Sequence, residues 1–212
     1  MSSMTPGFEK RDWVNLDITH RCGLECPRCL RQWYRKRDLR IPGEDMSIEI
    51  FEKVVDHYSM LIFCGQISDP IHHPKFIDFL KMAYSKNKRV SVHTASSLKS
   101  MKWFIEAFEA NVNATWTFGI DGLPKESHKY RVNQDGEKLY QAMVEARYIL
   151  KDRPVWQYIP FSYNETHIDE AKKMAEEADV VFALNISSRW WYKNDELMPK
   201  NPKLRLDNVF NA

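Results

Sequence analysis

Three cysteines stand within eight positions of one another in the stretch HRCGLECPRC, at Cys22, Cys26 and Cys29, and the chain has one other cysteine, Cys64. Spacings of four and three residues suit a 4Fe-4S cluster, because one tight loop can bring three thiolates to three of its irons. Such clusters normally have four cysteine ligands, so the fourth iron would lack a protein ligand. The triplet therefore predicts an iron–sulfur cluster with one open iron.

A zinc ion is the alternative occupant of this triplet. Zinc sites in proteins are tetrahedral, and either Cys64 or His20 would have to supply the fourth ligand. Structural zinc sites usually draw their ligands from two separated pairs, and a lone cysteine at the end of a buried strand is more often an ordinary packed thiol. The sequence favours the cluster and keeps a zinc-stabilised binding module for RNA or an acidic protein as the alternative.

The composition is that of an ordinary soluble globular protein. The chain has 212 residues, of which 43% are hydrophobic and 28% charged, and its formal net charge of +2 gives no reason to expect nucleic acid or a membrane surface as a partner. Neither the N-terminal residues nor any later stretch has the apolar run of a signal peptide or a membrane span. We therefore expect a cytoplasmic protein. Reducing conditions there keep thiols free, so the cysteine triplet is expected to hold metal and not to form disulfides.

Short β-branched and aromatic runs alternate with helical patterns along the chain, with Ser47 and Ser100 as predicted helix caps and Pro74 as a predicted helix start. The runs of strand length cover residues 13–19, 60–64, 89–94, 114–120, 155–161 and 180–186. Strands separated by helices need right-handed crossovers, which predicts an α/β fold with a parallel sheet and helices outside it. A complete eight-unit barrel usually needs about 250 residues, so six units predict an open sheet or part of a barrel.

Polar motifs follow most of the predicted strands. After the cysteine triplet come GQISDP (65–70), TASS (94–97), GIDG (119–122) and NISSR (185–189). Because the carboxyl ends of parallel strands meet at one rim, we expect these motifs to form one shared site. His93, inside a strand, is expected to be a hydrogen-bonded core residue. The basic run 28–40 is expected to be a solvated face, or a surface that binds an anionic substrate or an acidic electron donor.

Cys22-x3-Cys26-x2-Cys29, directly after the first strand of a repeated βα chain, resembles the signature of the radical S-adenosylmethionine (radical SAM) superfamily, and the resemblance extends over about residues 13–186. It implies a partial (β/α)6 barrel and a 4Fe-4S cluster whose open iron binds S-adenosylmethionine. It further implies cleavage of S-adenosylmethionine to a 5′-deoxyadenosyl radical, which abstracts hydrogen from a small molecule, nucleotide or peptide. The electron would come from a small donor protein such as flavodoxin or ferredoxin. With no cysteine after Cys64, the chain resembles a minimal form without a C-terminal auxiliary-cluster domain.

The resemblance also implies residues for binding S-adenosylmethionine. GQISDP stands where the family has a Gly-Gly-Glu-Pro motif for the methionine amino group, with Gln66 or Asp69 in the place of the glutamate. GIDG resembles a Ser-x-Asp-Gly motif with Gly119 in the serine's place. Arg131 is expected either to pair with the methionine carboxylate or to be a solvated loop arginine. The position before the third cysteine, commonly aromatic in the family, is Arg28. The full predicted set is Gly65, Gln66, Asp69, Pro70, Thr94, Ser96, Gly119, Asp121 and Arg131.

The chain is predicted to divide into a core domain, residues 1–186, and a C-terminal tail, residues 187–212. The tail begins at the carboxyl end of the last strand and carries bulky side chains at positions 189–192. Because a radical must be shielded from water, we expect the tail to cover the barrel mouth. Arg189 and Trp190 are then expected to contact the substrate.

Overall fold

A computed structural model of the chain describes residues 12–187, 190 and 195–206. In this part the strands form one six-stranded sheet in the order β1 to β6, and each neighbouring pair is parallel. The strands are β1 (Trp13–Leu16), β2 (Met60–Phe63), β3 (Arg89–Thr94), β4 (Thr115–Gly119), β5 (Val155–Tyr158) and β6 (Val181–Leu184). An order that follows the sequence without reversal belongs to a barrel, since doubly wound sheets reverse at a switch point. The predicted α/β class and partial barrel are confirmed.

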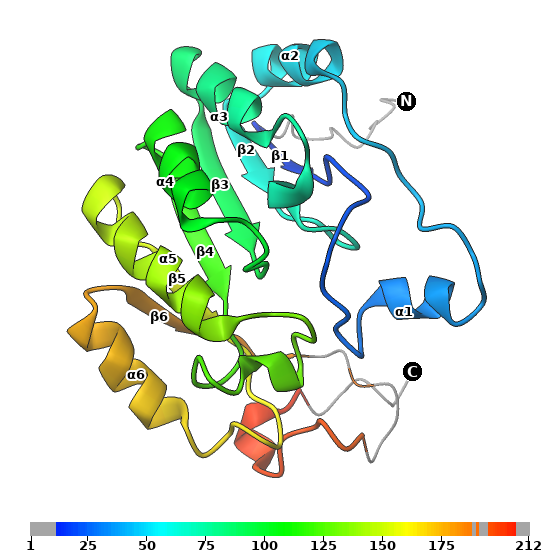
Figure 1. Cartoon of the computed structure of the whole chain (residues 1–212), viewed down its shortest axis with the longest axis vertical. Helices are drawn as coiled ribbons and strands as arrows, with labels where there is room; N and C mark the ends of the chain where they lie inside the picture. Colours follow the sequence, from blue (N-terminus) through cyan, green and yellow to red (C-terminus); the bar gives the residue numbers. More distant parts are fainter. Residues whose placement is uncertain (1–11, 188–189, 191–194, 207–212) are drawn as a thin grey trace, which may run out of the picture.

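Helices α2 to α6 cover one side of the sheet, whereas α1 lies apart from them on the loop that follows β1 (Figure 1). The helices are α1 (Leu30–Arg35), α2 (Ile48–His57), α3 (Phe76–Ser85), α4 (Met101–Ala110), α5 (Gly136–Ile149) and α6 (Ile168–Glu177). The predicted caps are confirmed, because the Ser47 and Ser100 hydroxyls accept hydrogen bonds from backbone amides in the first turns of α2 and α4. The third helix begins two residues after Pro74, since the His73 ring accepts a hydrogen bond from the Lys75 amide and holds a turn there.

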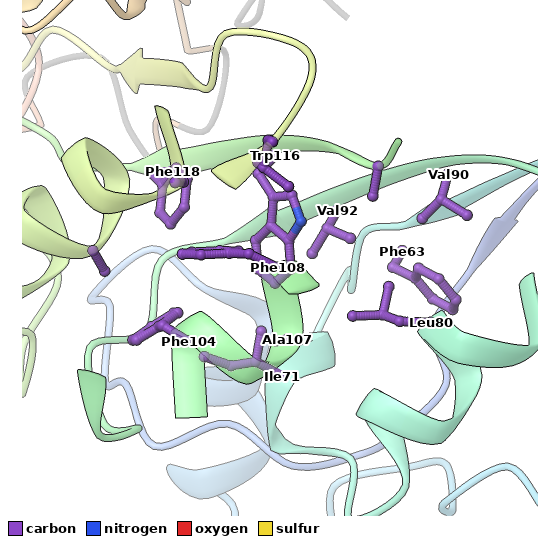
Figure 2. Packing of buried hydrophobic residues seen from close by; sticks show 14 of the residues in the cluster. Phe63, Ile71, Leu80, Val90, Val92, Phe104, Ala107, Phe108, Trp116 and Phe118 are labelled. Atoms are coloured by element: carbon purple, nitrogen blue, oxygen red, sulfur yellow. The ribbon is translucent and has the colours of Figure 1, made fainter. Parts of the chain in front are cut away.

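The hydrophobic core lies between the sheet and these helices. Residues from alternate strand positions, such as Trp116 and Phe118, meet Phe104 and Phe108 of α4 (Figure 2). The rings of Phe108 and Trp116 pack edge to face with their centroids 4.9 Å apart, an arrangement that aromatic pairs prefer. Because strand residues alternate in direction, the residues between these core positions must point to the other side of the sheet. No helix in the described part of the chain is long and apolar enough to cross a membrane.

Candidate functional site

A cavity of about 400 Å³ lies at the carboxyl ends of the strands, and its volume falls within the range of ligand pockets. All three clustered cysteines line it, together with residues from the loops after β2, β3, β4 and β5. Nine of the predicted site residues reach this cavity: Cys22, Cys26, Cys29, Gly65, Gln66, Asp69, Thr94, Gly119 and Arg131. Pro70, Ser96, Asp121 and Trp190 do not line it. The sequence motifs therefore meet at one rim, whereas the role of each residue stays a prediction.

Arg31, a buried residue of α1, links the cysteine loop (residues 20–29) to the loop after β2 by hydrogen bonds. One Arg31 nitrogen, Nη1, donates hydrogen bonds to the carbonyl oxygens of His20 and Ile67, at 2.7 and 2.8 Å. Asp17, just after β1, accepts a 2.9 Å hydrogen bond from the Gln66 amide. These contacts fix two loops that are about forty residues apart in the sequence. The sequence predicted neither α1 nor a buried arginine, because apolar residues do not recur at helical spacing in the basic run 28–40.

The surroundings of the three thiols are largely apolar. Cys26 is buried in a group formed by Leu24, Ala95, Tyr130, Phe161 and Trp190, and Cys22 and Cys29 pack against that group. Burial raises the pKa of Cys22 to about 12 and also raises the pKa of Cys26. A thiolate in such surroundings is stable only when a cation compensates its charge. Cys22, Cys26 and Cys29 are free thiols, so this donor set fits an iron–sulfur cluster.

In the described ranges, no group of three or more His, Cys, Asp or Glu residues is arranged to hold a single metal ion. A 4Fe-4S cluster makes a different demand, since each cysteine binds a separate iron at a separate corner. The three thiols therefore have to surround a volume rather than converge on a point. Their common position on the wall of one cavity meets that demand.

Asp69 ties the loop after β2 to the loop after β3. Its fully buried carboxylate accepts hydrogen bonds from the Thr94 hydroxyl at 2.8 Å and from the backbone amides of Ala95 and Ser96 at 2.8 and 3.1 Å. Burial raises the pKa of Asp69, and these hydrogen bonds act in the opposite direction. The carboxylate oxygens are thus occupied by the neighbouring loop. Gln66 and Asp69 both line the cavity, but the Asp69 carboxylate already accepts these hydrogen bonds.

Three polar residues on the inner face of the sheet line the cavity, although the sequence did not predict them as site residues. They are His93 of β3, Thr117 of β4 and Gln157 of β5. The ring of His93 is hydrogen-bonded to the Ser91 hydroxyl at 3.2 Å, as expected for a bonded residue, but it faces the cavity and not the core. The missed signal was strand alternation, since Val92, Trp116 and Trp156 next to these residues point into the core.

The C-terminal segment contacts the cysteine loop. Arg28 forms a bidentate ion pair with the buried Asp195, with nitrogen–oxygen distances of 2.6 and 2.8 Å, and bonds Glu196 at 2.7 Å. Trp190 is 5% exposed and packs edge to face on Phe161, 5.8 Å between ring centroids. Arg189, Trp191 and Tyr192, the other residues predicted to cover the mouth, lie outside the described residues.

Comparison with known proteins gives one curated relative and several solved structures. No family model matches the chain. A 117-residue region, 53% of this chain, is 26% identical to 31% of the tungsten-containing aldehyde ferredoxin oxidoreductase cofactor-modifying protein of Pyrococcus furiosus. The matched region is therefore less than a third of that relative's length.

Three solved structures share the fold over most of this chain. SuiB of Streptococcus suis bound to S-adenosylmethionine has a TM-score of 0.69 at 11% identity, covering 90% of this chain and 44% of SuiB. The enzyme anSMEcpe with bound S-adenosylmethionine has a TM-score of 0.62 at 16% identity, covering 86% and 55%. Coproporphyrinogen III oxidase (HemN) of Escherichia coli, a radical SAM enzyme, has a TM-score of 0.57 at 15% identity, covering 91% and 49%. The resemblance to radical SAM enzymes is thus confirmed at the level of the fold, and the chain spans about half the length of these proteins.

Proposed function

We propose that the chain is a radical SAM enzyme. The observation that carries the proposal is the position of Cys22, Cys26 and Cys29, which line one cavity at the carboxyl rim of a sheet with the fold of SuiB, anSMEcpe and HemN. When bound, the 4Fe-4S cluster supplies the electron that cleaves S-adenosylmethionine to the 5′-deoxyadenosyl radical, which takes a hydrogen atom from the substrate. This chain's own residues hold the cluster, orient S-adenosylmethionine and exclude water.

The loop after β2 is proposed to receive the methionine amino group. Gly65, Gln66 and Asp69 all line the cavity, but the Asp69 carboxylate is already bonded to Thr94 and to the loop after β3. Gln66 is therefore the better candidate for direct contact, and Asp69 acts by holding the two loops in register. Thr94, Ser96 and Pro70 are proposed to shape the same pocket.

The inner wall indicates which substrate groups the site would accept. The three charged side chains on the cavity wall are all engaged within the protein: Arg31 by two carbonyls, Asp69 by loop amides and Arg131 by Asp121. The remaining polar groups there include His93, Thr117 and Gln157. Burial lowers the pKa of His93, so its imidazole is neutral near pH 7. We propose that the reacting part of the substrate carries neutral amide or hydroxyl groups.

Peptides are the first substrates to test, because they present neutral amides. SuiB has been solved with the precursor peptide SuiA, and anSMEcpe with the Cp18Cys peptide. A small molecule or a nucleotide that presents hydroxyl groups to the same wall is the competing class. An amide and a hydroxyl both donate and accept hydrogen bonds, so Gln157 could bind either class, and only labelled substrates can distinguish them.

The electron donor is proposed to dock on α1, which begins directly after Cys29 and is thus a short path to the cluster. Leu30 and Trp33 are 52% and 42% exposed there, and the guanidinium of Arg37 lies 4.3 Å above the Trp33 ring. An apolar surface next to basic residues suits an acidic donor protein. Reduction by flavodoxin should slow with added salt and in Arg37→Glu. Equal rates at low and high salt would contradict docking at this surface.

Anaerobic reconstitution with iron and sulfide tests the proposal. The wild-type protein should bind about four irons per chain, give a cluster signal in electron paramagnetic resonance after reduction, and release 5′-deoxyadenosine from S-adenosylmethionine. Deuterium transfer from labelled peptide pools into 5′-deoxyadenosine would then identify the substrate class. A colourless protein that keeps one zinc per chain through the same treatment would instead support the zinc-stabilised binding module.

A further inference from the structure

The sheet opens between β3 and β4 at the rim of the cavity. The last paired residues of the two strands are Thr94 and Phe118. The next pair in this register, Ala95 and Gly119, lies beyond the ladder between them. β4 does not leave β5 at this point, because Gly119 is still paired with Gln157. The carbonyl groups at the opening therefore need partners other than the neighbouring strand.

The side chain of Gln134 supplies those partners. Its Nε2 donates hydrogen bonds to the carbonyl oxygens of Ala95 and Gly119, at 2.6 and 2.9 Å. Its Oε1 accepts a hydrogen bond from the Ser127 hydroxyl, and that hydroxyl accepts a 2.9 Å hydrogen bond from the Asp121 amide. Both hydrogens of the Gln134 amide are thus used, and its orientation is fixed, because only its nitrogen end can donate to two carbonyls. Gln134 replaces the missing backbone hydrogen bonds between the two strand ends.

Gln134 lies behind the cavity wall and supports it. The residue is 5% exposed and does not line the cavity, whereas Ala95 and Gly119 both do. A Cβ at position 119 would lie only 3.2 Å from the Cβ of Ala95, so the two strand ends are close together. A ligand can approach the backbone closely where there is no side chain. The distance that Gln134 sets between the two carbonyls therefore sets the width of this part of the pocket.

The residues next to Gln134 contact the cysteine loop. Asn133 Nδ2 donates a 3.2 Å hydrogen bond to the Gly23 carbonyl, and the Glu25 amide donates one of 3.0 Å to the Val132 carbonyl. Asn133 has a φ of 73°, in the left-handed region that asparagine enters more readily than most residues. These contacts do not involve the Gln134 side chain. A change of that side chain should therefore leave the cysteine loop in place.

We propose that Gln134 is a positioning residue for S-adenosylmethionine, which holds the opening between β3 and β4 at the width that admits the nucleoside part of the molecule. The inference rests on the proposed function, in which the loop after β2 receives the methionine amino group. The cavity continues from that loop to the loops after β3 and β4, which leaves this part of the rim for the nucleoside. A pocket that already has its bound shape loses less free energy on binding than one that the ligand must order. Gln134 therefore acts on the affinity for S-adenosylmethionine and not on retention of the cluster.

Calorimetry of S-adenosylmethionine binding to the reconstituted protein, with its cluster oxidised, tests the proposal. Gln134→Met keeps a side chain of similar length but removes the amide, and it should raise the dissociation constant by about tenfold, equivalent to the loss of one hydrogen bond. Iron per chain should match the wild type, as should the electron paramagnetic resonance spectrum of the reduced cluster without S-adenosylmethionine. An unchanged dissociation constant, or loss of the cluster, would overturn the proposal.

Asn111→Leu is the matched control for lost stability. The Asn111 side chain is also a buried amide, 1% exposed, and is hydrogen-bonded to the Leu80 carbonyl and the Asn113 amide at 3.4 and 3.2 Å. It lies between the end of α4 and the start of β4, away from the carboxyl rim. This variant should lower the urea midpoint of the apoprotein and leave the dissociation constant unchanged. Equal weakening of binding in both variants would attribute the effect to stability alone and refute the role of Gln134.

A second variant, Ser127→Ala, keeps the proposal testable if Gln134→Met does not fold. It removes the hydroxyl that orients the Gln134 amide and should weaken binding less than Gln134→Met does. The double variant should bind no more weakly than Gln134→Met alone, because both residues act through one chain of hydrogen bonds. Wild-type affinity in Ser127→Ala would count against the proposal. A wild-type protein that carries the cluster but does not bind S-adenosylmethionine would refute the proposed function itself, a result distinct from unchanged binding in a variant.

Discussion

The two faces of the same strands differ in chemistry although they alternate residue by residue. On the outer face, Val92, Trp116 and Trp156 are fully buried against the helices. One residue further along each strand, His93, Thr117 and Gln157 line the cavity on the inner face. The outer face has aromatic and aliphatic side chains that pack, and the inner face has neutral side chains that form hydrogen bonds. Residues that pack in the core and residues that line the cavity are therefore neighbours in the sequence.

This separation means that stability and function can be changed independently. Removing a fully buried aromatic side chain costs transfer free energy and leaves a cavity. Replacing a side chain that lines an open cavity costs little, because the side chain is already in contact with solvent or ligand. Substitutions on the outer face should thus lower stability and spare the site, and substitutions at the site should do the reverse.

The largest effect is expected at the cysteine loop. Replacing Cys22, Cys26 or Cys29 by Ala should abolish cluster retention, because a cluster with one open iron has no spare ligand. Cys64→Ala is the matched control, and its iron content should stay near that of the wild type. Iron per chain after anaerobic reconstitution and desalting measures both. Complete loss of iron in the Cys64 variant would identify Cys64 as a fourth ligand and refute the open iron.

On the outer face, Trp116→Ala should lower the free energy of unfolding of the apoprotein by about 3–5 kcal/mol. Thr117→Val, one residue away on the inner face, removes only a hydroxyl and should change it by no more than about 1.5 kcal/mol, the usual net contribution of one hydrogen bond. Urea denaturation under anaerobic conditions measures both values. Equal destabilisation by the two variants would mean that the faces do not differ as the structure indicates.

The outer face was readable from the sequence, and the inner face was not. Apolar periods predicted the strands and helices, and capping chemistry predicted the positions of Ser47 and Ser100. Both faces of a parallel sheet are covered, however. A polar strand residue such as His93 can therefore be assigned to the core or to a cavity only once the curvature of the sheet into a partial barrel is known. The roles of the binding residues remain predictions, and only their common position at the rim follows from the topology.

Contacts between distant segments were also beyond the sequence. The ion pair of Arg28 with Asp195 joins residues 167 positions apart. No spacing or periodic pattern in the sequence predicts it. The same holds for Arg31, whose two carbonyl partners belong to different loops. The sequence showed only that Arg28 stands at a position that is commonly aromatic in the radical SAM superfamily. It did not show that Arg28 pairs with Asp195.

An intermediate effect is expected at the junction of the C-terminal segment and the cysteine loop. Arg28→Met leaves the Asp195 carboxylate buried without its main cation, which is costly, and should detach the segment from the loop. The cluster should remain, because no ligand is lost, but solvent would reach the site and raise the ratio of 5′-deoxyadenosine formed to substrate consumed several-fold. Truncation after Ile186 should have the same effect. Arg40→Met is the control, because Arg40 belongs to the same basic run and its exposed side chain pairs with Glu44. An unchanged ratio in both tail variants would leave the segment without a role in the site.

The smallest effect concerns the charge of the inner face. Burial lowers the pKa of His93 below its ordinary value of 6.5, so the unfolded chain binds a proton more readily than the folded chain. The stability contributed by neutral His93 is therefore present above pH 6.5 and is lost as the pH falls through the folded pKa. In His93→Asn, the decline in unfolding free energy between pH 7 and pH 5 should be shallower by at most about 1.4 kcal/mol per pH unit. Urea titrations of the apoprotein at several pH values measure the slope, with Thr117→Val as the non-titrating control on the same wall. A slope identical to that of the wild type would mean that the inner face admits a charged imidazole, and the restriction to neutral substrate groups would then fail.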